Sequence, residues 1–241
     1  MTENTTSNPA IDIQRAYYAS DEQTLDPAEG VAGSHDLPIS LLLGYLGGQE
    51  IGSLLDVGAG TGRTLSKIHA AHPNISLRGV EPSPVLRRVG LERWGMAPDQ
   101  VMDGDALALP FPDRSFDMVT AFGILHHIKD PGRAVGELAR VARRGVFISD
   151  ANCYGQGGTA IRLAKRVLRG LGLWSALKYL RTGGKGYFIS EGDGLYYTYS
   201  LIDDLPILNR RFEHVMLLNP VGHSIDHAHQ APTLVAIARD S

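Results

Sequence analysis

Short apolar runs alternate with amphipathic stretches through the middle of the chain, each separated from the next by a few polar or glycine residues. The apolar runs predict strands, and the stretches between them carry apolar residues at helical spacing. Strands that alternate with helices through short turns favour a parallel sheet with helices on both faces. The predicted strands span 53–57, 76–81, 99–103, 116–121 and 146–149, and the predicted helices span 61–72, 83–94 and 131–143.

The last two apolar segments follow a different pattern. Residues 212–218 and 233–238 have no helix between them, so we expect an antiparallel pair joined by the long loop 219–232. The predicted fold class is therefore α/β: a doubly wound, Rossmann-like sheet of seven strands, mostly parallel, with an antiparallel last strand.

Three further segments lie outside this alternation. Residues 1–10 form a polar tail, and 11–48 predict an N-terminal helical cap in front of a main domain that spans 49–241. The segment 151–205 is too long for one connection and predicts two amphipathic helices. We interpret this insert as a lid over an acceptor pocket, because it begins at the carboxyl end of the sheet, where ligands bind. A solvated helical face is the alternative, and a membrane-surface helix is disfavoured because we expect no strongly apolar face.

The first predicted strand ends in Asp56 and runs into a turn with glycines at 58, 60 and 62. Glycine lets the backbone approach a ligand closely, because it has no Cβ. A turn between strand and helix is where open α/β sheets place cofactors, although a tight turn that binds nothing remains the alternative. Arg63 stands where a dinucleotide fingerprint has its last glycine, which disfavours a nicotinamide cofactor.

Polar residues also follow the next predicted strands. Glu81 ends the second strand, where a carboxylate can accept two hydrogen bonds from a ribose diol. Asp105 and Ala106 come after the third strand, and Phe122 comes after the fourth.

With these motifs in this order, residues 52–150 resemble the class I S-adenosylmethionine-dependent methyltransferases, in their small-molecule, type 11-like branch. The resemblance implies S-adenosyl-L-methionine as cofactor and S-adenosyl-L-homocysteine as product. It implies that the glycine turn surrounds the methionine moiety, that Glu81 holds the ribose, and that Phe122 lines the sulfonium pocket. Tyr18 closes over the cofactor in this prediction, with ordinary helix packing as the alternative. The predicted cofactor-binding residues are Asp56, Gly58, Ala59, Gly60, Gly62, Glu81, Pro82, Asp105 and Ala106 (the last two at the adenine), Phe122 and Tyr18.

Methyl transfer needs a base only if the acceptor enters protonated, and a base that works near neutral pH is best supplied by histidine. His126 and His127 follow the fourth strand, and His126 matches a histidine often found there in the family; a structural hydrogen bond is its alternative role. His223 is the third catalytic candidate, in a loop that also holds Asp226, His227 and His229. Their spacing is typical of metal ligands, but they lack regular helical placement, so we expect no metal.

Composition and charge limit the cellular location and the class of partner that we expect. The chain has 241 residues, a formal net charge of −3 and one cysteine, which excludes an intramolecular disulfide. No apolar run is long enough to cross a membrane and the N-terminus lacks a signal-peptide pattern, so we expect a cytoplasmic protein. Net acidity and the lack of a recognition module disfavour nucleic acid. Residues 151–190 contain seven basic and no acidic residues, which can attract an acidic partner or steer an anionic substrate, with the solvated face of a helical insert as the alternative. The mixed aromatic and basic lining expected of the lid favours an anionic or glycosylated acceptor.

The sequence therefore predicts an enzyme that moves a methyl group to an oxygen or nitrogen of a small molecule such as a natural product or a sugar. Two alternatives remain open: a cyclase or decarboxylase on the same scaffold, and a non-catalytic partner subunit. The choice between a monomer and a homodimer is also open.

Overall fold

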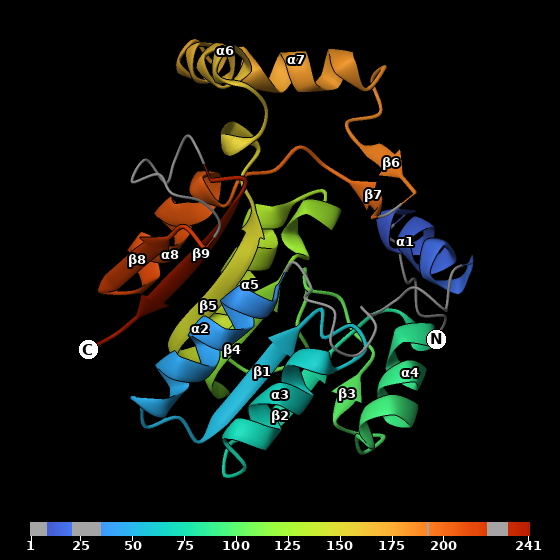
Figure 1. The fold of residues 1–241 in the computed structure, drawn as a ribbon, viewed down its shortest axis with the longest axis vertical. Coiled ribbons are helices and arrows are strands. Elements are labelled where there is room, and N and C mark those ends of the chain that lie inside the picture. The colour runs from blue at the N-terminus through green and yellow to red at the C-terminus, as the bar shows by residue number, and fades with distance from the viewer. Residues whose placement is uncertain (1–8, 21–34, 192, 221–230) are drawn as a thin grey trace.

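A seven-stranded sheet forms the centre of the molecule (Figure 1). The computed structural model describes residues 9–20, 35–191, 193–220 and 231–241. The strand order is β3-β2-β1-β4-β5-β9-β8, and all neighbours are parallel except β9, which is antiparallel to both β5 and β8. The predicted fold class is confirmed. The strands are β1 Ser53–Val57, β2 Ser76–Val80, β3 Val101–Met102, β4 Phe116–Phe122, β5 Ala142–Ala151, β8 His214–Leu218 and β9 Thr233–Arg239.

Helices precede the sheet and connect its parallel strands. Two of them begin at side-chain caps: Ser83 accepts a hydrogen bond from the Leu86 amide, and Asp130 accepts one from the Arg133 amide. A proline follows each cap at the first helical position, where its missing N–H costs nothing. The helices are α1 Pro9–Ser20, α2 Asp36–Gly47, α3 Arg63–Ala71, α4 Pro84–Trp94 and α5 Pro131–Val141.

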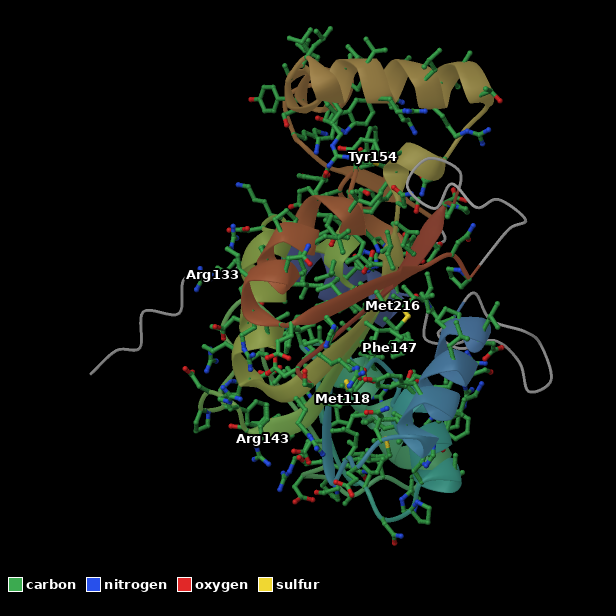
Figure 2. The ribbon with its side chains drawn as sticks, turned by 90° about the vertical axis from the view of Figure 1, so that its left-hand side faces the viewer. Met118, Arg133, Arg143, Phe147, Tyr154 and Met216 are labelled. Atoms are coloured by element: carbon green, nitrogen blue, oxygen red, sulfur yellow. The ribbon has the colours of Figure 1, made fainter. Side chains whose placement is uncertain are left out.

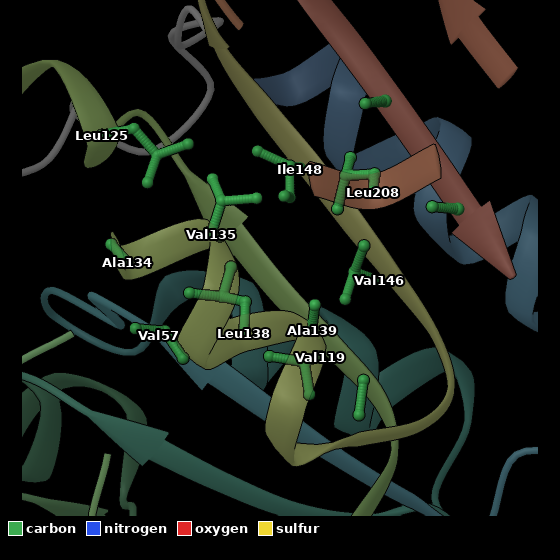
Figure 3. Close-up of a cluster of buried hydrophobic side chains, with 14 of the residues drawn as sticks. Val57, Val119, Leu125, Ala134, Val135, Leu138, Ala139, Val146, Ile148 and Leu208 are labelled. Carbon is green, nitrogen blue, oxygen red and sulfur yellow. The ribbon is translucent and has the colours of Figure 1, made fainter. Parts of the chain in front are cut away.

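The two faces of the sheet carry separate hydrophobic layers. Alternation along β1 sends Leu55 and Val57 to one layer and Leu54 to the other. The first layer packs against α5 and against α8 Leu205–Arg211, the short helix at the end of the insert. Its members include Val135, Leu138 and Leu208 (Figure 3). The second layer packs under α2 and α3 and includes Met118 and Phe147, which Figure 2 labels. Both faces are therefore covered, and the carboxyl edge of the parallel strands is left for a ligand.

The insert after β5 contains more structure than the sequence predicts. Its two amphipathic helices are present as α6 Thr159–Gly170 and α7 Trp174–Arg181, and they lie at one end of the molecule, beyond the sheet (Figure 1). A hairpin of β6 Phe188–Ser190 and β7 Gly194–Tyr196 and a short helix α8 Leu205–Arg211 were not predicted. None of the helices in the described part of the chain is long and apolar enough to span a membrane.

Candidate functional site

A cavity of about 690 Å³, part of it open to solvent, lies at the carboxyl ends of β1 and β2. This is where the strand order reverses, between β1 and β4, and such switch points are the usual ligand sites of open α/β sheets. Its sheet-side lining comes from the segments that follow β1, β2, β3 and β4, and α1 supplies the rest. The lining residues are Ala10, Ile11, Gln14, Arg15, Tyr18, Gly58, Val80, Glu81, Pro82, Ser83, Gly104, Asp105, Ala106, Ile124, His127 and Ile128.

The glycine turn is held against β2 and leaves no room for side chains at two of its positions. The amides of Gly58 and Ala59 both donate to the Val80 carbonyl, at 2.7 and 3.0 Å. A Cβ on Gly58 would lie 2.4 Å from Ile124, and one on Gly62 would lie 2.1 Å from the Met96 sulfur. Both glycines also have positive φ, so packing and backbone conformation require them. Gly58 lines the cavity, which lets a ligand approach the backbone there.

Glu81 is the most informative side chain of the cavity. It is only 5% exposed, and its two carboxyl oxygens accept hydrogen bonds from the Ser83 amide at 2.8 Å and the Gly60 amide at 2.9 Å. Burial outweighs these amides and raises the pKa of Glu81 to about 7. Each carboxyl oxygen has a second lone pair for a ligand donor, such as a ribose hydroxyl.

Asp56 lies one layer deeper. It is 2% exposed, and the Thr120 hydroxyl donates to it at 2.7 Å. Burial, together with the nearby Glu81 carboxyl, raises the pKa of Asp56 to about 7. Five of the predicted cofactor-binding residues lie in the described part of the chain but do not line the cavity. They are Asp56, Ala59, Gly60, Gly62 and Phe122.

Helix α1 covers one side of the cavity. Arg15 donates from Nε to the Pro82 carbonyl at 2.9 Å, and the amide of Gln14 donates to the Tyr18 hydroxyl at 3.0 Å. Tyr18 lines the cavity, and burial raises its pKa to about 12. Sequence reasoning missed Gln14 and Arg15, although both lie on the same helical face as Tyr18 and Ile11.

Asp105 and Ala106 also line the cavity. The Asp105 carboxylate accepts a hydrogen bond from the Leu107 amide at 2.9 Å, which shapes the turn after β3. Both residues lie near Glu81, because β3 pairs in parallel with β2.

His126 and His127 lie on a 3-10 turn, Leu125–His127, that follows β4. Asp150, near the end of β5, anchors this turn by accepting hydrogen bonds from the Leu125 amide at 2.7 Å and from His126 Nδ1 at 2.8 Å. The other ring nitrogen of His126 faces Asp193 at 3.3 Å. Burial alone would lower the pKa of His126, but the two carboxylates outweigh it and raise that pKa to about 10. His126 is therefore an imidazolium at neutral pH.

His127 has the opposite electrostatic setting. Its Nδ1 lies 2.6 Å from the Leu195 carbonyl oxygen, which only accepts, so Nδ1 carries the hydrogen and Nε2 keeps a lone pair when the ring is neutral. Burial and the neighbouring charge of His126 lower the pKa of His127. His127 lines the cavity and His126 does not.

The same turn brings together three groups of the kinds that bind metals, although His126 as an imidazolium has no lone pair for a metal ion. His126, His127 and the Asp193 carboxylate place one ligand atom each within 4.8 Å of one another. Asp193 and Asp150 were missed by sequence reasoning, because only the tertiary fold brings them to the histidines. The predicted candidate His223 and its neighbours Asp226, His227 and His229 lie outside the described residues.

His35 and Phe122 form a further contact beside this turn. Their rings lie 6.5 Å apart between centroids, and Phe122 also packs on Phe147. Burial lowers the pKa of His35, and its Nδ1 has no hydrogen-bond partner within the described residues.

Comparison with known proteins gives this site a context. Residues 55–149 match the methyltransferase domain family. Demethylmenaquinone methyltransferase from Roseiflexus sp. (strain RS-1) is 37% identical over 98 residues, which cover 41% of each chain. Phosphatidylethanolamine N-methyltransferase from Cereibacter sphaeroides is 35% identical over 98 residues, covering 39% of this chain and 47% of its own. The matched segment thus spans less than half the length of these curated relatives.

A solved structure resembles the chain over a longer range. Magnesium protoporphyrin IX methyltransferase (ChlM) from Synechocystis PCC 6803, with bound S-adenosylhomocysteine, covers 96% of this chain and all of its own at a TM-score of 0.58 and 17% identity. At that identity the likeness concerns the fold alone.

The doubly wound sheet and the cavity at its switch point define the class: a class I S-adenosylmethionine-dependent methyltransferase fold. Within that fold, the segment 55–149 is the part of the chain that matches the methyltransferase domain family. The cofactor of this family is S-adenosylmethionine, as the resemblance implied. The residues present fit it, because Gly58 leaves its backbone bare at the cavity wall, where Ile124 has no room for a Cβ, and Glu81 offers buried carboxyl oxygens.

Proposed function

We propose that this chain transfers a methyl group from S-adenosylmethionine to an oxygen or nitrogen of a small molecule. The observation that supports this best is that one cavity is lined both by Glu81, a buried carboxyl suited to a ribose, and by His127, whose Nε2 keeps a lone pair in the neutral ring and lies 3.6 Å from the Asp193 carboxylate. The relatives support the acceptor class, since demethylmenaquinone and phosphatidylethanolamine are small molecules. When bound, the cofactor supplies an electrophilic methyl group on a sulfonium.

The residues that line the cavity divide into two groups in this proposal. Glu81 accepts hydrogen bonds from the ribose hydroxyls, Asp105 and Ala106 contact the adenine edge, and Gly58 flanks the methionine moiety. Pro82 and Tyr18 close the sides of the cavity. Asp56, Ala59, Gly60, Gly62 and Phe122 act indirectly, by shaping the turn and the end of β4.

We assign the role of general base to His127 rather than His126. A base must be unprotonated at working pH and must have a lone pair directed toward the acceptor. The lowered pKa of His127 supports the first condition, and its donation from Nδ1 to Leu195 leaves the lone pair on Nε2, at the cavity lining and 3.6 Å from Asp193. His126, held as an imidazolium between Asp150 and Asp193, positions the turn instead.

Methyl transfer is tested by incubating the full chain with S-adenosylmethionine and a panel of hydroxyl and amine acceptors, and measuring S-adenosylhomocysteine together with the methylated product. We expect His127→Gln to lower kcat by about a hundredfold or more on an acceptor that must lose a proton, with little change in the KM for the cofactor. The exposed His69 provides the matched control, His69→Gln, which should leave kcat unchanged.

The alternatives give different outcomes in the same assay. A cyclase or decarboxylase would consume its substrate without forming S-adenosylhomocysteine, and a non-catalytic subunit would bind the cofactor without turnover. Unchanged kcat in His127→Gln would contradict the role assigned to His127 while leaving methyl transfer in place. An anionic or glycosylated acceptor is a finer proposal, which the acceptor panel tests directly.

A further inference from the structure

Helices α6 and α7 turn an apolar face away from the protein. They lie at one end of the molecule, apart from the sheet (Figure 1). Seven of the thirteen large hydrophobic side chains that are exposed in the described part of the chain belong to this short stretch, and each is more than half exposed. They are Ile161, Leu163, Val167, Leu171, Leu173, Tyr179 and Leu180.

The orientation of α6 is fixed by its basic side. Lys165 donates from Nζ to the carbonyl oxygens of Cys153 at 2.6 Å and Gln156 at 2.9 Å. Arg169 pairs with Asp203 at 2.8 Å, and its guanidinium lies 4.6 Å from the centre of the Tyr154 ring. Tyr154 lies below the helices, on the side of the main body (Figure 2).

A small apolar cluster also packs beneath the two helices. Trp174 is buried against Tyr154, with Leu168 and Leu177 partly buried beside them. In a helix that packs on its own domain, the apolar stripe faces the core and the charged side faces water. In α6 the basic side faces the protein and the apolar side faces outward. The expectation that the insert lacks a strongly apolar face is therefore wrong.

The charged side chains of residues 151–190 are all positive. Residues 151–190 contain seven basic residues and no acidic ones. Three of these cations, Lys165, Lys178 and Arg169, are engaged with the body, whereas Arg166, Arg181 and Lys185 are exposed. The outward face therefore combines apolar side chains with exposed positive charge.

We propose that the α6–α7 face docks on the surface of a bilayer that contains anionic phospholipid. A pair of amphipathic helices with apolar side chains on one face and basic residues beside them lies in the plane of such an interface, with the apolar residues among the acyl chains and the cations at the phosphates. A second copy of the chain fits less well, because a two-fold contact of this face with itself would bring positive charges together with no acid in 151–190 to offset them. The docking is independent of methyl transfer.

The proposal is tested by sedimenting the full chain with vesicles of phosphatidylcholine alone or of phosphatidylcholine with phosphatidylserine. We expect wild-type protein to bind the anionic vesicles at least about tenfold better, and Leu163→Ser/Val167→Ser/Leu171→Ser to lose at least about tenfold of that binding. Arg166→Glu/Arg181→Glu should lose the preference for anionic vesicles. The matched control is Leu37→Ser/Met216→Ser, which changes apolar side chains of similar exposure on α2 and β8 and should bind like wild type.

Binding of S-adenosylhomocysteine and the circular dichroism of each variant show separately whether the fold and the cofactor site are intact. Equal sedimentation of the triple variant and wild type would overturn the proposal, as would wild-type protein that ignores anionic vesicles. A wild-type dimer that the triple variant abolishes, with no vesicle binding, would overturn it in favour of a second copy.

Discussion

Asp56 and Glu81, two buried carboxyl groups next to the glycine turn, have pKa values raised to about 7, so the proposed cofactor site titrates near neutral pH. A protonated carboxyl is a poorer hydrogen-bond acceptor than a carboxylate, and a ribose hydroxyl donates best to the ionised form. At the scale of single residues, cofactor binding is therefore coupled to the release of a proton from Glu81.

The first prediction concerns this coupling. Affinity for S-adenosylhomocysteine should rise as pH increases through about 7, by up to about tenfold for each unit by which binding lowers the pKa of Glu81. Calorimetry across pH in buffers of different ionisation enthalpy measures both the affinity and the proton released. Glu81→Gln should weaken binding and flatten the pH dependence, whereas the exposed control Glu92→Gln should retain it. A pH dependence that survives in Glu81→Gln would assign the titration to another group.

The second prediction concerns His126. Its folded-state pKa of about 10 lies above the ordinary histidine value, so its contribution to stability is complete below about pH 6.5 and is lost as pH rises through about 10. His126→Gln should lower the free energy of unfolding by about 3 kcal/mol at neutral pH, with the difference from wild type shrinking toward pH 10. Denaturant unfolding of both proteins over that range measures it. A difference independent of pH would show that His126 is not the charged partner of Asp150 and Asp193.

At the scale of elements, the turn between β1 and α3 depends on glycine for two different reasons. Gly60 and Gly62 both have positive φ, but a Cβ added at Gly60 would meet nothing within 4 Å, whereas one added at Gly62 would meet the Met96 side chain. Packing between this turn and the segment after α4 therefore depends on Gly62 specifically.

The third prediction uses that pair of glycines. Gly60→Ala should cost about 1 kcal/mol of stability, from backbone strain alone, whereas Gly62→Ala should cost about 2 kcal/mol or more, because Met96 must also move. Thermal and denaturant unfolding of the two variants provide the comparison. Equal losses would contradict the role given to the Met96 contact, and Gly62→Ala/Met96→Ala should recover part of the difference.

The sequence predicts the elements that have strong periodicity and misses those that lack it. Strands β1, β2, β4 and β5 and helices α3, α4 and α5 follow from apolar patterning, because each buries a continuous face. The hairpin β6–β7 has three residues in each strand and α8 is short, so neither carries enough pattern to be recognised.

The residues of the candidate site also fall into those that the sequence predicts and those that it does not. Glu81, Asp105 and His127 follow strands in the sequence and could be found from it. Asp150 and Asp193 could not, because their contacts with His126 depend on the pairing of β4 with β5 and on the fold of the insert.

At the scale of the whole molecule, helix α1, which lines the cavity, also contacts the β6–β7 hairpin. The Leu195 amide donates to the Gln14 side chain at 2.9 Å, and the Tyr17 hydroxyl donates to the Glu191 carbonyl at 2.7 Å. Segments from the N-terminus and from the insert thus meet beside the cavity (Figure 1). A bound cofactor would leave fastest when this contact opens.

The fourth prediction follows from that contact. Gln14→Ala removes the hydrogen bond to Leu195 and should increase the rate of S-adenosylhomocysteine dissociation by about threefold to tenfold, with a smaller effect on association. Stopped-flow measurement of both rates tests it, with Ser20→Ala, an exposed position on the same helix, as the control. An unchanged dissociation rate would show that α1 and the hairpin do not retain the ligand.

The central claim is that the cavity between the glycine turn, Glu81 and α1 holds S-adenosylmethionine. The most direct test is titration calorimetry of S-adenosylhomocysteine into wild type, Asp56→Ala and Glu81→Ala, each shown to be folded by its thermal transition. We predict one site per chain in wild type and affinity weakened by more than about tenfold in both variants. No binding to wild type, or unaltered affinity in both variants, would contradict the account.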